Sequence, residues 1–172
     1  IGLCATAGAR LLGATTIIAV DGNDHRLGIA QKMGADVTLN FKNCDVIDEI
    51  MKITGGRGAD SAIEALGTQA TFESALRSIK PGGTLSSLGV YSEDLKIPLS
   101  AFAAGLGDHK INTALCPGGK ERMRRLMNVL ASNRLDLGLL VTHQYKLDDI
   151  VAAYDLFAHQ RDGVLKVAIT PQ

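Results

Sequence analysis

The chain has 172 residues, enough for one domain with a sizeable core plus an appendage. Its 18 basic residues balance 18 acidic ones, so no broad electrostatic field is available to attract nucleic acid or an anionic membrane. The sequence therefore predicts no nucleic-acid partner and no membrane partner.

The cysteines and histidines are scattered. Cys4, Cys44 and Cys116 form no Cys-x-x-Cys pair, and none of the four histidines has a partner at metal-ligand spacing, which argues against a disulfide framework and against a metal site. No apolar run approaches the roughly 20 residues of a membrane span, and no leader-like segment is visible. We expect a soluble, cytoplasmic protein.

Helices and strands are predicted to alternate along most of the chain. Apolar spacing and glycine stops predict helices over residues 2–12, 23–34, 46–53 and 69–79. Between and after them, strands are predicted over residues 16–20, 37–40, 59–66, 84–91 and 110–115, with a Pro-Gly-Gly turn at 81–83. This alternation predicts an α/β fold with a parallel sheet and helices on both faces.

The last part of the chain departs from this pattern. A helix is predicted from the Pro-Gly-Gly turn at 117–119 to about Asn133, with strands over 140–145 and 164–169 bracketing a helix over 147–157. In the first of these helices, a buried stripe is expected from Met123, Leu126, Met127 and Leu130. Two strands around a helix often belong to a neighbouring domain, so we place a boundary near Asp136.

The acidic residue Asp21 closes the first predicted strand. If Gly2 is the third glycine of a Gly-x-Gly-x-x-Gly turn, Asp21 lies 19 positions on, close to the roughly 20-residue spacing of the carboxylate that binds the adenosine ribose. A carboxylate accepts hydrogen bonds from a ribose 2′-hydroxyl but repels a 2′-phosphate, which favours NAD over NADP. Asp21 is alternatively an ordinary turn residue, and Arg26 either stacks on the adenine or faces solvent.

Several segments together resemble the cofactor-binding domain of zinc-dependent medium-chain alcohol dehydrogenases. They are "IGLCATAGARLLGA" from Ile1, "IIAVDGNDHRLGIAQKMGAD" from Ile17, "GADSAIEALG" from Gly58, "LRSIKPGGTLSSLGVYS" from Leu76, "TALCPGGKERM" from Thr113 and "VTHQYKLDDIVAAYDLFAHQRDGVLKVAI" from Val141. The resemblance covers essentially the whole chain. It implies a Rossmann-type doubly wound sheet over residues 1–135 and a C-terminal segment, 136–172, that returns to a catalytic domain.

The resemblance also implies cofactor-binding roles. Asp21 would bind the ribose, and Asn23 stands where NADP-binding members carry part of a Gly-Ser-Arg cluster. Lys166 would contact the pyrophosphate, although an exposed strand lysine is an equal alternative. Leu66 and Gly67 are expected near the adenine, and Gly89, Val90, Tyr91, Leu115 and Cys116 near the nicotinamide. Cys116 is otherwise a small packing residue without a base to activate it.

Parts of the family pattern are absent from the sequence. The zinc-ligating domain, the first strand and the first two fingerprint glycines are not found, which predicts a gap in the strand order 3-2-1-4-5-6. We therefore expect a fragment that is inactive alone, with no catalytic residues of its own and with zinc only in the full-length enzyme.

The expected function is the NAD-binding portion of an enzyme that moves a hydride between the cofactor and a small alcohol or carbonyl substrate. A non-catalytic dinucleotide-sensing domain and a zinc-free NADPH quinone or enoyl reductase are the alternatives, and a nucleotide-binding methyltransferase fits the closing segment poorly. In many relatives the last sheet strand pairs with its copy in a second subunit. We accordingly expect a homodimer or homotetramer formed through residues 110–115.

Overall fold

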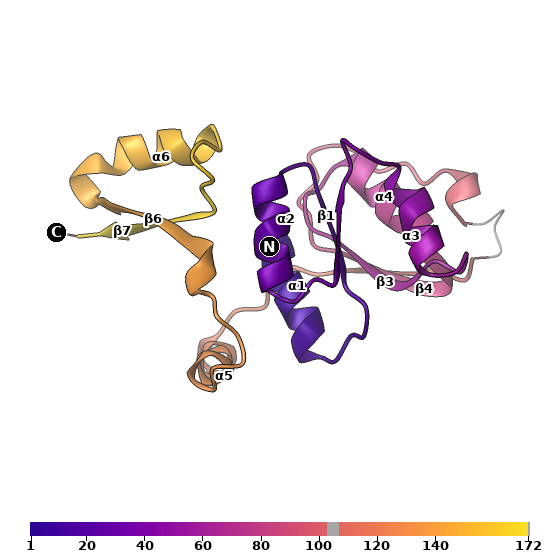
Figure 1. Ribbon diagram of the computed structural model, residues 1–172, viewed down its shortest axis with the longest axis horizontal. Coiled ribbons are helices and arrows are strands. Elements are labelled where there is room, and N and C mark those ends of the chain that lie inside the picture. The colour runs from indigo at the N-terminus through magenta and orange to yellow at the C-terminus, as the bar shows by residue number, and fades with distance from the viewer. Residues whose placement is uncertain (103–106, 172) are drawn as a thin grey trace. The chain divides into compact units, whose positions relative to one another are not determined.

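The computed structural model describes residues 1–102 and 107–171. The chain divides into two compact units, Ile1–Gly119 and Lys120–Gln172, which can be followed from indigo to yellow in Figure 1. Among the described residues, no helix has both the length and the apolar character needed to cross a membrane.

Helices and strands alternate along the first unit, as the sequence predicts. Asn23, Asp45 and Thr68 each cap a helix, because their side-chain oxygens accept hydrogen bonds from backbone N–H groups of the first turn. In chain order the elements are α1 (Gly2–Leu11), β1 (Ile18–Asp21), α2 (Asp24–Lys32), β2 (Val37–Asn40), α3 (Val46–Ile53), β3 (Ala59–Glu64), α4 (Gln69–Ser78), β4 (Ile79–Ser87), the 3₁₀ helix η1 (Leu99–Phe102) and β5 (Lys110–Thr113).

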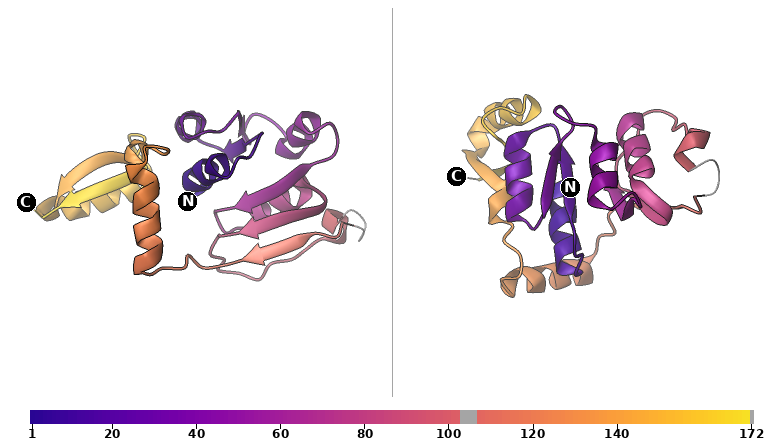
Figure 2. Two further views of the ribbon diagram at one scale, coloured as in Figure 1. Left: turned by 90° about the horizontal axis from the view of Figure 1, so that it is seen from below. Right: turned by 45° about the vertical axis from the view of Figure 1, so that its right-hand side comes forward.

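The strands of the first unit form two parallel sheets. β1 pairs with β2, and β4 lies between β3 and β5; the three-stranded sheet is seen in the left view of Figure 2. In the expected order 3-2-1-4-5-6 these are strands 3-2 and 4-5-6, so the break between the sheets falls where the first strand was predicted to be missing. The predicted Rossmann-type α/β fold is confirmed.

Two apolar cores support these sheets. In one, Phe72 and Leu76 of α4 pack against Ile79 and Leu85 of β4 and against Ala101 of η1. In the other, small and branched side chains join α1 and α2 to the start of β1; its buried members are Ile17, Ala30 and Ala35. Helices therefore hold both sheets by apolar burial, the main favourable term in folding.

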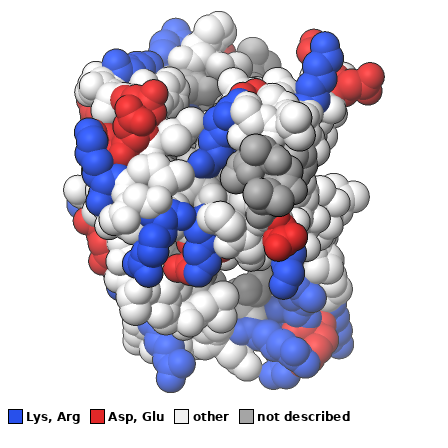
Figure 3. Space-filling view, turned by 90° about the vertical axis from the view of Figure 1, so that its right-hand side faces the viewer, with Lys and Arg blue, Asp and Glu red and all other residues white. Residues whose placement is uncertain are grey.

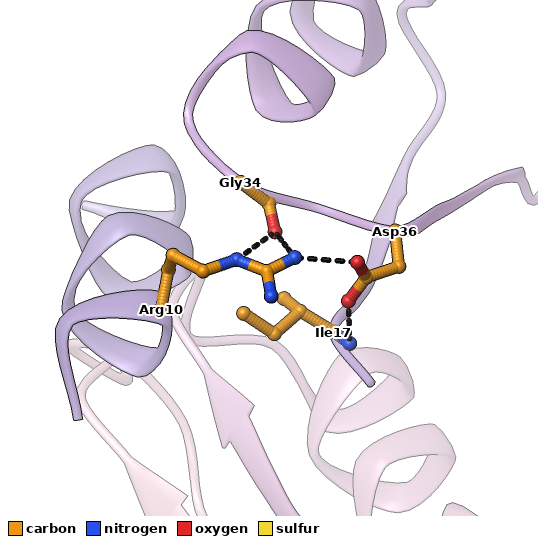
Figure 4. A network of polar contacts seen from close by, with 4 residues as sticks. All are labelled: Arg10, Ile17, Gly34 and Asp36. Carbon is orange, nitrogen blue, oxygen red and sulfur yellow. Dashed lines mark hydrogen bonds and ion pairs between the residues drawn. The ribbon is translucent and has the colours of Figure 1, made fainter. Parts of the chain in front are cut away.

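A polar network holds the start of β1 in place (Figure 4). The Arg10 Nε and Nη2 atoms donate to the Gly34 carbonyl at 3.2 and 2.8 Å, and the guanidinium also binds the Asp36 carboxylate. The second oxygen of Asp36 accepts the Ile17 N–H at 2.8 Å. The hydrogen bond from Arg10, followed by that from Ile17, holds the pKa of Asp36 below its usual value. The end of α1, the turn after α2 and the entry to β1 are thereby joined.

The second unit has a small parallel sheet of its own, in which β6 pairs with β7. Ala153 and Val164 are its buried apolar residues. Its elements are α5 (Lys120–Ala131), the 3₁₀ helix η2 (Gly138–Leu140), β6 (Val141–Lys146), the 3₁₀ helix η3 (Leu147–Asp149), α6 (Ile150–Ala158) and β7 (Lys166–Thr170).

Two local predictions are wrong. The segment 81–83 is not a turn before β4 but an irregularity within it, because Ile79 already pairs with Ala59 and the register shifts before Thr84 pairs with Ser61. The expected buried stripe of α5 is exposed at Met123, Leu126 and Met127, so the described residues of the second unit do not cover that face. Helical spacing marks an apolar face without saying what covers it.

The division between the units falls at Gly119, earlier than the predicted boundary near Asp136. The difference is mainly α5, which groups with the second unit. The assignment of residues 136–172 to a returning catalytic domain remains a prediction.

Candidate functional site

Asp21 is the last residue of β1, as predicted, and its carboxylate lies at the beginning of α2. One oxygen accepts the backbone N–H of Asn23 at 2.9 Å, and the other lies 3.9 Å from the Arg26 guanidinium. Asn23 in turn caps α2 by accepting the N–H groups of His25 and Arg26. The predicted residues Asp21, Asn23 and Arg26 therefore form one cluster. The side chain of Asp21 is 36% exposed.

Phe41, which the sequence analysis did not single out, lies beside this cluster. Its backbone N–H donates to the Asp21 carbonyl at 3.4 Å, and its ring occupies the space where a side chain at Gly22 would lie, with Cζ 2.5 Å from a Cβ built there. The ring is exposed nevertheless. The ring of Phe41 thus lies over Gly22, a neighbour that "Asp-Gly" read as a turn pair does not reveal.

A second cluster joins the loops that follow β3 and β4. A Cβ built on Gly67 would lie 2.5 Å from the Val90 carbonyl oxygen, and one built on Gly89 would lie less than 3.0 Å from the Gly67 backbone. Gly67 also has a positive φ of 97°, a conformation that favours glycine. The predicted residues Leu66, Gly67, Gly89 and Val90 are thus brought together by direct backbone contact.

Beneath this contact lies Glu64, a residue that the sequence analysis missed. It ends β3, is only 3% exposed, and accepts hydrogen bonds from Leu66 N, Gly67 N and Thr71 Oγ1 on one oxygen and from the Tyr91 hydroxyl on the other. Burial alone would raise the pKa of Glu64, but these hydrogen bonds outweigh burial and hold it below its usual value. The charged carboxylate therefore stabilises the fold above about pH 4, and this contribution is lost as the pH falls through the lowered pKa.

Exposed apolar side chains follow the ends of the three-stranded sheet. Leu66 is 68%, Val90 80% and Leu115 85% exposed, and Cys116 is exposed beside Leu115. Because Ser87 of β4 pairs with Thr113 of β5, the segments that carry Val90 and Leu115 leave the sheet at the same edge. Ligands of open α/β sheets bind outside the carboxyl ends of the strands, so these residues suit contact with a flat ring.

The structure does not join the remaining predicted residues to these clusters. Gly2 begins α1, and a Cβ built on it meets no atom within 4 Å. Lys166 begins β7 in the second unit, where its carbonyl accepts the Thr142 hydroxyl at 3.2 Å. No hydrogen bond or ion pair within residues 1–102 and 107–171 links the Asp21 cluster to the Glu64 cluster.

The surface charge is mixed. On the face in Figure 3, acidic and basic side chains lie next to one another. Among the residues that the structure describes, no three His, Cys, Asp or Glu side chains are grouped so that they could hold a metal ion. We therefore derive no chemical step through a metal.

Comparison with known proteins identifies the family. Residues 1–132 match the family described as zinc-binding dehydrogenases. The chain belongs to this family. The chain is 84% identical, over 99% of its length, to an alcohol dehydrogenase of Cupriavidus necator. It covers 47% of the length of that protein. It is 36% identical over 98% of its length to an NADP-dependent isopropanol dehydrogenase of Clostridium beijerinckii, covering 49%.

Solved structures agree with this family. Alcohol dehydrogenase TADH from Thermus sp. ATN1 superposes with a TM-score of 0.88 at 29% identity, over 99% of this chain and 48% of that one. The chain thus spans about half the length of the relatives it matches. The predicted membership of the zinc-type alcohol dehydrogenase family and the nicotinamide cofactor class are supported.

The clusters of this zinc-binding dehydrogenase chain fit a nicotinamide dinucleotide. The Asp21 carboxylate offers a partly exposed acceptor at a strand end, and the close contact of Gly67 with Gly89 brings together the backbones that carry the exposed residues Leu66 and Val90. Backbone without side chains is what close approach of a ligand requires. The residues present are compatible with the cofactor that the family uses.

Proposed function

We propose that this chain is the cofactor-binding half of an alcohol dehydrogenase that transfers a hydride between NAD and an alcohol or carbonyl substrate. The observation that carries the proposal is the 84% identity, over 99% of the chain, to a protein named alcohol dehydrogenase. When bound, the cofactor would supply the hydride acceptor for an alcohol whose hydroxyl loses its proton as the alcohol carbon releases the hydride. The residues of this chain bind and orient the cofactor.

The preference for NAD rests on Asp21. Its carboxylate accepts hydrogen bonds from ribose hydroxyls, whereas a 2′-phosphate brought to the same place meets a like charge. Arg26 is the cation nearest to it, but it already faces Asp21 at 3.9 Å. The NADP-dependence named for the C. beijerinckii relative is therefore not transferred to this chain.

The other residues receive binding roles by position. Leu66 and Gly67 face the adenine side of the cofactor, and Gly89 with Val90 faces the nicotinamide. Leu115 and Cys116, which follow β5, cover the nicotinamide, and the family resemblance assigns Lys166 a contact with the pyrophosphate. Gly2 allows the start of α1 to approach the phosphates.

Two alternatives make different predictions for the full-length protein. A dinucleotide-sensing domain would bind the cofactor without turning over any substrate, and a zinc-free reductase would oxidise NADPH with a quinone or an enoyl substrate. We expect instead that the full-length protein reduces NAD in the presence of primary or secondary alcohols, and that a zinc chelator abolishes this activity. Binding without turnover, or turnover only of NADPH with a quinone, would refute the alcohol dehydrogenase assignment.

We further propose that the full-length protein is a homodimer or homotetramer paired through β5. All four residues of β5 are exposed, and β5 is an edge of its sheet, pairing only with β4 among the described residues. An open edge presents unpaired backbone groups that a second copy can satisfy. Light scattering should report at least a dimer for the full-length protein, and Ile111→Pro, which removes a backbone donor from β5, should shift it toward monomer. A monomeric wild type would contradict the assignment.

A further inference from the structure

Glu64 occupies an unusual place for a carboxylate. It is only 3% exposed, and no cation is recorded against it among the described residues. A buried charge of this kind is costly unless hydrogen bonds replace the lost water. Four groups donate to it, namely the Leu66 and Gly67 N–H groups, the Thr71 hydroxyl and the Tyr91 phenol, and the Ser87 hydroxyl lies 3.4 Å away. The cost of burial is met entirely by neutral donors.

The two oxygens of Glu64 serve different loops. Oε1 accepts Leu66 N at 2.7 Å, Gly67 N at 2.8 Å and the Thr71 hydroxyl at 2.8 Å, all after β3. Oε2 accepts the Tyr91 hydroxyl at 2.6 Å, and the Tyr91 oxygen in turn accepts the Ser87 hydroxyl at 2.6 Å. Ser87 ends β4, and Tyr91 lies just beyond it. One carboxylate therefore ties together the ends of two neighbouring strands.

These same loops touch through Gly67 and Gly89. A Cβ built on Gly89 would lie 2.5 Å from Glu64 Oε2 as well as against the Gly67 backbone, so the carboxylate lies directly under the contact. The spacing of the two loops is thereby set by Glu64 from below and by the two glycines at the surface.

Tyr91 is turned toward this network. Its hydroxyl donates to Glu64 and lies 2.6 Å from Ser87 Oγ, which completes the chain of hydrogen bonds. Its ring packs edge-on against Phe72 at a centroid distance of 6.1 Å and an interplanar angle of 83°. The hydroxyl is thus committed inside the protein, not directed at a cofactor ring.

We propose that Glu64 is a positioning residue for the dinucleotide, with the Tyr91 hydroxyl as its partner, and that together they set the spacing of the Leu66–Gly67 and Gly89–Val90 backbones on which the cofactor lies. This role rests on the proposed function. A carboxylate suits it because every group that faces Glu64 donates, and a carboxylate is an acceptor only. An amide would either turn an NH₂ group toward the two backbone N–H groups or require the Tyr91 hydroxyl to accept instead of donate.

The test uses the full-length enzyme with Tyr91→Phe and Glu64→Gln, and with Glu73→Gln as the matched control. Tyr91→Phe keeps the ring on Phe72 and removes one donor. Glu73 lies on α4 and pairs with Arg77 at 2.7 Å, away from both loops. The Kd of NADH is measured by fluorescence titration well below each variant's unfolding temperature, and kcat and the KM of NAD are measured alongside.

We expect Tyr91→Phe and Glu64→Gln each to raise the NADH Kd and the NAD KM on the order of tenfold, with a smaller change in kcat. The double variant should have an NADH Kd only slightly higher than that of the single variant with the higher Kd, because both changes break the same hydrogen-bond network. Glu73→Gln should leave the Kd unchanged. If Glu64→Gln does not fold, Tyr91→Phe decides the result.

An unchanged Kd in variants that merely melt at lower temperature would assign Glu64 to stability alone and overturn the positioning role. A wild-type enzyme that binds neither NADH nor NADPH would instead refute the proposed function, and the positioning role with it. The two failures are therefore distinguishable by the wild-type titration.

Discussion

Replacing Gly89 by alanine is expected to weaken NADH binding by more than tenfold in the full-length enzyme and to lower its stability. The added Cβ would lie less than 3.0 Å from both Gly67 N and Gly67 Cα, and 2.5 Å from Glu64 Oε2. The Gly67 backbone and the hydrogen-bonded Glu64 carboxylate cannot move aside as easily as the end of a flexible side chain can. The two loops must separate, at a cost of about 1 to 3 kcal/mol, and the surface between Leu66 and Val90 loses its shape.

Gly118→Ala is the matched control, because a Cβ built on Gly118 meets no atom within 4 Å and its φ is not positive. It should alter neither the Kd nor the unfolding temperature by much. Titration of NADH against both variants, with thermal unfolding measured on the same samples, provides the comparison. A Gly89→Ala enzyme that binds NADH as tightly as the wild type would show that the loop contact does not shape the cofactor site.

Replacing Asp21 by alanine is expected to weaken NADH binding by roughly 1 to 3 kcal/mol, since charge-assisted hydrogen bonds to the ribose are lost. NADPH binding should weaken less or improve, because the like charge facing the 2′-phosphate is removed and Arg26 is released from its carboxylate partner. The preference for NADH over NADPH, expressed as the ratio of the NADH affinity to the NADPH affinity, therefore falls. Isothermal titration of both reduced cofactors against the full-length variant measures it.

Asp24→Asn controls for this change. Asp24 is the first residue of α2, three positions after Asp21, and its carboxylate accepts a hydrogen bond from the Asn40 amide at 2.6 Å. It should leave the NADH to NADPH ratio near the wild-type value. Equal effects of Asp21→Ala and Asp24→Asn would mean that net charge, and not the position of Asp21, governs the choice of cofactor.

The sequence predicts the strands and strand ends around the site well, but it does not predict the contacts between the loops that follow them. Strand ends such as Asp21 are local features, readable from an apolar run followed by a turn residue, and the parallel pairing of β3, β4 and β5 follows from helix and strand alternation. The family resemblance alone placed Gly67 and Gly89 near the cofactor, and their direct contact was not predicted. Contacts between residues 22 positions apart depend on strand register, which spacing along the chain does not specify.

Glu64 illustrates why the rest was missed. It lies within a segment predicted as a strand, where acidic residues are depleted, and "IEALG" carries no motif that distinguishes a functional acid from an ordinary strand residue. Its meaning appears only when the Tyr91 hydroxyl and two backbone N–H groups converge on it. The only signal in the sequence was the acidic residue itself, at the end of a predicted strand. Phe41 offered none, because its place over Gly22 depends on the pairing of β1 with β2.

We propose that this chain holds NAD, in preference to NADP, through Asp21. The most direct measurement is the pair of dissociation constants of NADH and NADPH for the wild-type full-length protein, taken in one buffer at one ionic strength. The account predicts that NADH binds at least about tenfold more tightly, a difference of about 1.4 kcal/mol. Equal binding, or tighter binding of NADPH, would contradict it.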